Sequence, residues 1–201
     1  VNTVINKTRA RVSNTNAGGV KVNNLLIDAV NDSSILTGSV GAGISGTASV
    51  TGSDTTSIIS NTTAAELVNA QFGQAAGSVR VTASDTSTIQ ALAGNAGTAG
   101  GAAIGAALAV NVITNTTRAQ ISGGSLDVKG ETTVTASNSS TIETIGVAGG
   151  FSPAVSVYGS VATSHIVNTT AAEILHANLT DSAGGNSAVK VSAEDKATIR
   201  S

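Results

Sequence analysis

The sequence predicts an all-β fold, a parallel β-helix (β-solenoid) in which strands stack from one repeat to the next. Three observations carry this prediction. One motif recurs four times at a nearly constant spacing, and small or β-branched residues alternate with polar ones. Gly, Asn, Ser and Asp, rather than helical patterns, separate the apolar segments. We expect residues 1–201 to form a single solenoid domain.

The repeat is defined by two independent anchors. The first is an Asn that opens a Thr- or Ala-rich segment, and it occurs at Asn6, Asn61, Asn115 and Asn168. The second is an Ala followed six residues later by Ile, and it occurs at Ala29, Ala83, Ala136 and Ala193. Both anchors have a period of about 54 residues, which predicts four equivalent structural units.

The segments after the asparagines are expected to be strands. Ala65 and Leu67 flank Glu66, and Ala119 and Ile121 occupy the same places in the next unit. A period of two with polar residues on the other face is typical of a half-buried strand. The third unit reaches glycines directly after this segment, which suits a short strand better than a helix.

A unit of about 54 residues is long for one turn of a solenoid, so the pattern favours two turns of about 27 residues or three of about 18. Seven to eleven turns would then form a rod roughly 35 to 55 Å long. In this interpretation the Asn and Thr residues stand at corners, where their side chains satisfy backbone groups. A β-sandwich is the alternative, although it gives no reason for the strict repeat.

Neither end of the sequence has an atypical capping segment, which a solenoid needs to cover its exposed edges. We therefore expect this chain to be part of a longer array, the alternative being a complete small protein. Seven asparagines begin an Asn-x-Ser/Thr triplet and are candidates for either glycosylation or structural hydrogen bonds. They are Asn6, Asn31, Asn61, Asn115, Asn138, Asn168 and Asn178.

Composition excludes several classes of function. The chain has no Cys, which excludes disulfides and thiolate metal sites, and its net charge of −2 argues against a nucleic-acid partner. The longest apolar run extends from residue 100 to residue 113 and is interrupted by Asn111. That is too short for a transmembrane helix, so we expect no membrane insertion by this segment.

The chain offers few residues for catalysis, and we expect no enzymatic activity, metal or cofactor. His165 and Ser164 are adjacent in a predicted strand and so point to opposite faces, while His176 is expected at the surface or a corner. The carboxylates are scattered, and the calcium-binding and phosphate-binding loop motifs are absent. We interpret the glycine-rich residues 97–101 as close backbone packing at a tight bend.

Residues 106–119 and 79–89 resemble the passenger repeats of very large bacterial surface proteins. These include autotransporter adhesins, filamentous-haemagglutinin-like exoproteins and leukotoxin-type proteins. The resemblance covers the whole chain through its composition and repeat style. It implies a right-handed β-helix, export through the outer membrane by an autotransporter or two-partner route, and a rod on the cell surface. It implies no catalytic residue.

The sequence therefore leads us to expect a structural and adhesive segment of an extracellular surface protein, with host or bacterial cell-surface receptors or glycans as partners. Self-association along the rod is a further expected contact. The alternatives are a spacer or filament subunit without a ligand and a carbohydrate-active β-helix enzyme. The candidate surface contacts are the outward charged residues Arg9, Arg11, Glu66, Arg80, Arg118, Glu173 and Lys190.

Overall fold

The structure is a computed structural model that describes residues 1–15, 23–184 and 187–201. Within these residues it consists of strands and connecting turns and contains no helix. The strands are β1 (Asn2–Ser13), β2 (Asn24–Ser45), β3 (Ala48–Ala76), β4 (Ser78–Ala99), β5 (Ala102–Val128), β6 (Thr132–Phe151), β7 (Val155–Leu175), β8 (Asn178–Thr180) and β9 (Val189–Arg200).

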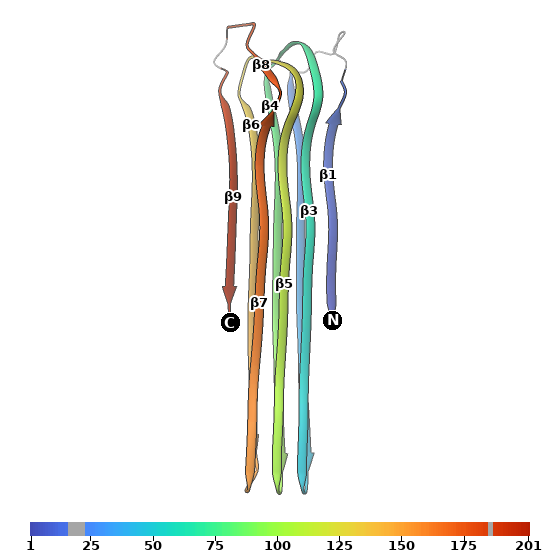
Figure 1. Cartoon of the computed structure of the whole chain (residues 1–201), viewed down its shortest axis with the longest axis vertical. Coiled ribbons are helices and arrows are strands. Elements are labelled where there is room, and N and C mark those ends of the chain that lie inside the picture. Colours follow the sequence, from blue (N-terminus) through green and yellow to red (C-terminus); the bar gives the residue numbers. More distant parts are fainter. Residues whose placement is uncertain (16–22, 185–186) are drawn as a thin grey trace.

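The strands form two parallel sheets. Sheet A has the order β1-β3-β5-β7, with the short β8 paired to β5, and sheet B has the order β2-β4-β6-β9. Long strands that follow one another in the chain thus lie in different sheets, and they run along the long axis of the molecule (Figure 1). The buried core contains residues of both sheets, so the sheets pack face to face. The prediction of an all-β fold with parallel strands is confirmed.

The strand register shows how the repeat is used. Asn6 pairs with Asn61, Asn61 with Asn115, and Asn115 with Asn168. One passage through both sheets, which we call a winding, therefore takes one whole repeat. The prediction of two or three shorter turns in each repeat is wrong. The four windings extend only roughly 15 Å across neighbouring strands, whereas β3 alone is about 90 Å long.

The expectation of short strands is wrong for a physical reason. Strands β2 to β7 contain between 20 and 29 residues each. The Gly, Asn and Ser residues that we interpreted as breaks lie inside these strands, and many of them point between the sheets. Asn115 lies within β5 and is 1% exposed, so the Asn-Thr-Thr motif is not a corner. The chain bends at Gly100 and Gly101, as expected for the glycine-rich segment.

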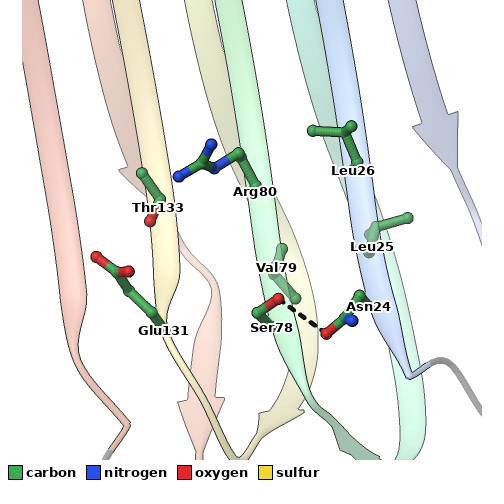
Figure 2. Close-up of a pocket in the computed structure, with 8 residues that line it drawn as sticks. All are labelled: Asn24, Leu25, Leu26, Ser78, Val79, Arg80, Glu131 and Thr133. Carbon is green, nitrogen blue, oxygen red and sulfur yellow. Dashed lines mark hydrogen bonds between the residues drawn. The ribbon is translucent and has the colours of Figure 1, made fainter.

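Because the register is constant, equivalent residues of successive windings form rows across each sheet. Asn24 and Ser78 are such neighbours in sheet B, and the Ser78 hydroxyl donates a hydrogen bond of 2.9 Å to Asn24 Oδ1 (Figure 2). The predicted alternation is confirmed by the inward rows. Ala65, Leu67 and Ile121 are fully buried between the sheets.

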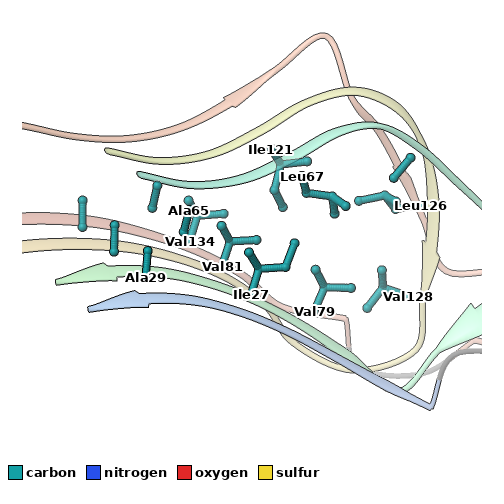
Figure 3. Close-up of a cluster of buried hydrophobic side chains, with 14 residues drawn as sticks. Ile27, Ala29, Ala65, Leu67, Val79, Val81, Ile121, Leu126, Val128 and Val134 are labelled. Carbon is teal, nitrogen blue, oxygen red and sulfur yellow. The ribbon is translucent and has the colours of Figure 1, made fainter. Parts of the chain in front are cut away.

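The largest hydrophobic cluster lies where β4 and β6 begin and β3 and β5 end. It contains 14 buried Ala, Val, Ile and Leu side chains from both sheets (Figure 3). A smaller cluster farther along the strands consists of isoleucines and Ala91, and its fully buried members include Ile59, Ile89 and Ile113. These clusters supply the apolar burial that stabilises the pair of sheets, and truncating one fully buried Ile or Leu to Ala typically costs about 2–5 kcal/mol.

A buried polar layer separates the two clusters. It consists of the residues Asn6, Asn31, Ser33, Asn61, Thr63, Asp85, Ser87, Asn115, Thr117, Asn138, Ser140 and Asn168. Asn61 of sheet A donates to Ser33 at 3.1 Å and to Ser87 at 3.0 Å, which belong to two successive windings of sheet B. The layer therefore links the sheets and the windings at the same time.

Asp85 is the acceptor at the centre of this layer. Its carboxylate is 1% exposed and accepts hydrogen bonds from Asn31 at 2.8 Å, Thr63 at 3.0 Å, Ser87 at 2.8 Å and Asn115 at 2.9 Å. These donors come from three windings and both sheets. Removing the carboxylate would leave several buried donors without a partner, and each such donor costs about 1–3 kcal/mol.

We therefore expect Asp85→Ala to lower the free energy of unfolding by about 3 kcal/mol or more. Asp85→Asn should cost less, because Asn31 and Asn138 occupy the same row in neighbouring windings. Urea unfolding followed by circular dichroism measures both changes. Thr86→Ala, at the exposed next position, is the control and should change stability by less than about 0.5 kcal/mol. Equal effects of the alanine substitutions at 85 and 86 would contradict this account.

Candidate functional site

Five of the seven candidate contact residues gather on the outer face of sheet A. The constant register places Arg9 and Arg118 in one row, and Arg11, Glu66 and Glu173 in the row two residues farther along the strands. Between the two rows lies an inward row of alanines, Ala10, Ala65, Ala119 and Ala172, which packs in the largest hydrophobic cluster. The alternation of the sequence therefore presents these charges side by side on one surface.

The charges of this surface are paired with one another. Arg9 forms an ion pair with Glu66, and its Nε donates to Glu66 Oε2 at 2.9 Å. Arg11 Nε lies 3.7 Å from the same oxygen, and Arg118 donates to Glu173 Oε2 at 2.8 Å. Three arginines are thus paired with two glutamates. The arginines of these pairs are well exposed, although Glu66 is only 13% exposed. Ion pairs with such exposed cations contribute little stability, typically about 0–1 kcal/mol, and the guanidinium groups remain accessible.

Arg80 and Lys190 do not belong to this surface. They share a row on the outer face of sheet B, with Leu26 and Thr133 in the same row. Arg80 lines a shallow hollow near the start of β4, together with Asn24, Leu26 and Glu131 (Figure 2). The seven candidates therefore divide between two opposite faces, and one partner surface cannot contact all of them at once.

The outer face of sheet B carries a further charged group that the sequence did not lead us to expect. On the outer face of sheet B, Gln90, Glu143 and Arg200 follow one another in a row. The amide of Gln90 donates to Glu143 Oε2 at 3.0 Å, and Arg200 donates to Glu143 Oε1 at 2.7 Å. The Gln90 hydrogen bond and then the Arg200 guanidinium lower the pKa of the Glu143 carboxyl. Neighbours in this row are about one repeat apart in the sequence, so the group would have been found had one winding per repeat been assumed.

The Asn-x-Ser/Thr triplets serve mainly the interior. Asn31, Asn61, Asn115 and Asn138 are buried, and their side-chain nitrogens donate hydrogen bonds within the polar layer. A glycan on these nitrogens would occupy space that the second sheet fills. Asn178, on β8, is the exposed member of the set. The structural interpretation thus holds for the four buried residues, although they lie within strands rather than at corners.

The histidines lie apart from any nucleophile and acid pair in the described part of the chain. Ser164 points inward, where its hydroxyl lies 3.2 Å from Thr144 Oγ1, whereas His165 is exposed on the opposite face, as predicted. His176 lies at a bend with a φ of 53°. Among the described residues, no three His, Asp or Glu side chains converge in a way that could hold a metal ion.

Comparison with known proteins identifies no relative of this chain: no protein-family model, curated protein or solved structure matches it. Across the described ranges, no helix is long and apolar enough to cross a membrane. The Arg and Glu rows on sheet A bring together five of the seven predicted contact residues.

The lowered pKa of Glu143 leads to a prediction about how stability depends on pH. Because the pKa of Glu143 is lowered in the folded chain, its contribution to stability is present above the ordinary value and is lost as pH falls through the lowered one. Gln90→Leu removes the larger cause, so the pKa of Glu143 should rise toward its ordinary value. Side-chain carboxyl NMR titration measures it. Thr88→Leu, on the same face, is the control, and an equal pKa in both variants would contradict the assignment.

Proposed function

We propose that this chain is a structural and adhesive segment of a secreted or surface-anchored bacterial protein, with a right-handed β-solenoid fold. The observation that carries the proposal is the in-register stacking of four windings, each built from one repeat. The right hand is supported by the strong preference of crossovers between parallel strands for that hand. An extracellular location is supported by the resemblance of the repeats to those of exported surface proteins.

Stacking gives such a segment a simple mechanism of attachment. Every winding adds one strand to each outer face at a spacing of about 4.8 Å, so each outward position recurs as a row. A partner with a repeated structure, such as a glycan chain or a cell surface, meets several equivalent groups at once. Individually weak contacts then add through the high effective concentration of linked sites.

The Arg and Glu rows of sheet A are the proposed contact surface. Arg9, Arg11 and Arg118 exceed their two Glu partners by one positive charge. Guanidinium groups bind carboxylates through paired hydrogen bonds and stack on flat groups. A cell-surface receptor or glycan that carries carboxylates fits this surface better than a neutral one does.

A spacer without a specific ligand is the second candidate, and one observation favours it. The ion pairs Arg9–Glu66 and Arg118–Glu173 satisfy these charges within the chain itself. A face that satisfies its own charges needs no partner. In this case the segment would separate other regions of the protein or associate with copies of itself.

The experiment is binding of the folded chain, immobilised on beads, to host cells, bacterial cells and a panel of neutral and acidic glycans. We expect saturable binding that Arg9→Ala/Arg11→Ala/Arg118→Ala weakens at least tenfold, which corresponds to about 1.4 kcal/mol. The loss of charged groups on the surface should leave the fold intact, because exposed ion pairs contribute little to stability.

The matched control is Arg80→Ala/Lys190→Ala, which removes positive charge from the opposite face. It should bind as the unchanged chain does. Equal weakening by both variants would indicate general charge attraction and contradict the proposed surface. No binding by a chain shown to be folded would support the spacer.

A further inference from the structure

One end of the molecule exposes apolar side chains on both of its outer faces. We call it the apolar end and define it as residues 36–53, 91–110 and 144–161. It is the end where β2, β4 and β6 finish and β3, β5 and β7 begin, at the bottom of Figure 1. On sheet B, Ile44 is 91% and Phe151 69% exposed, and on sheet A, Val50 is 81% and Val157 57% exposed. The apolar surface continues away from the tip through Val40, Leu92, Ile145, Val147, Leu108 and Val161.

The interior of this end consists of small and polar residues around the ring of Tyr158, which lies against Gly97, Gly105 and Gly150. Ala93, Ala107 and Ala109 are buried between the sheets. A Cβ added to Gly41 of sheet B would lie 2.5 Å from the carbonyl oxygen of Gly52 in sheet A, so the two backbones approach closely there. Strands of a water-soluble sheet normally place their large apolar residues inside. Here those residues face outward.

Charge is nearly absent from this end, where Asp54, in one row with Leu108 and Val161 on the outer face of sheet A, is the single charged residue. Residues 33–53, 86–117 and 144–172 contain no Asp, Glu, Lys or Arg. The turns at residues 46–47, 100–101 and 152–154 consist of Gly, Thr, Ser, Pro and Ala. Large apolar exposed surfaces that lack charge mark sites where a protein or a membrane binds.

The arrangement of the apolar residues favours a membrane over a second copy of the chain. A second copy that packs sheet against sheet covers one outer face and leaves the other exposed. A lipid phase covers both faces and the turns at the same time.

We propose that the apolar end docks on a lipid bilayer with its turns leading, and that Ile44, Phe151, Val50 and Val157 enter the acyl-chain region. The strands at the margins of each sheet carry backbone groups that hydrocarbon cannot satisfy. These groups limit the depth, so the tip enters rather than the whole apolar end. The binding is hydrophobic and needs no anionic headgroup. It involves residues other than the Arg and Glu rows and is independent of the proposed function.

This inference departs from our expectation that the segment does not insert into membranes. That expectation rested on the absence of a long apolar run. In a strand only every second residue faces outward, so an apolar face forms without such a run. The burial of each residue in the structure was needed to show that the alternation is inverted here.

The test is co-sedimentation of the chain with phosphatidylcholine vesicles. We expect binding that does not change between low and high salt. Ile44→Asp/Phe151→Asp places two charges in one tip row and should weaken partitioning about tenfold for each residue replaced. Thr86→Asp/Ser139→Asp places the same charges in one row on the charged half of sheet B and should bind as the unchanged chain does. Circular dichroism establishes that both variants fold.

A second measurement locates the tip in the bilayer. The chain contains no Trp, so Phe151→Trp provides a single fluorescent reporter. Its emission should shift to the blue on vesicles and be quenched by brominated acyl chains, whereas Thr86→Trp should show neither change. Binding that requires anionic lipid and disappears in salt would overturn the proposal. So would the absence of vesicle binding together with concentration-dependent self-association in ultracentrifugation, because a second copy would then cover the apolar end.

Discussion

Hydrogen bonds between buried Asn, Asp and Ser side chains of the two sheets are the constraint on which this structure depends. Asn115 donates to Asp85 at 2.9 Å and to serines of two windings, so one side chain aligns both sheets and their neighbours. If one strand shifted its register by one residue, all of its inward side chains, these amides and the apolar residues alike, would move to the outer face. A slip of two toward the isoleucine cluster would place Asn115 in the row of Ile113 and leave buried polar groups without partners, at a cost of several kcal/mol. Apolar burial holds the sheets together, and the polar layer determines their register.

The constant register explains why the two ends of the molecule differ. Inward rows change in size along the strands, from Leu67 and Ile121 through the polar layer to Ala93 and Ala107. Large apolar residues lie inside at one end and outside at the other. The Arg and Glu rows of sheet A lie toward the end with the large apolar interior, beside Ala65 and Ala119 of the largest cluster. The same winding therefore carries a polar outer surface suited to contacts in water and an apolar tip suited to lipid.

The period of the repeat and the inward alternation could be predicted from the sequence, because both are carried by the order of residues alone. The number of turns in each repeat could not. Asn61 and Ser87 are typical of turns when read in the sequence, and only their hydrogen-bond partners in the other sheet show that they lie within strands. For the candidate site, Arg118 and Glu173 were expected outside and lie there, but their contact needed the register. The apolar end was missed because alternation does not say which face is buried.

The most direct test of the central claim measures which residues are neighbours in adjacent windings. The chain has no Cys, so pairs introduced at outer positions can be joined by a short thiol cross-linker without background. Thr62 and Thr116 are one repeat apart and pair in sheet A, while Thr62 and Gln90 are about half a repeat apart and lie on opposite faces. We expect Thr62→Cys/Thr116→Cys to cross-link efficiently within one chain and Thr62→Cys/Gln90→Cys to remain open. Efficient cross-linking of the second pair and not of the first would contradict one winding per repeat and, with it, the polar layer.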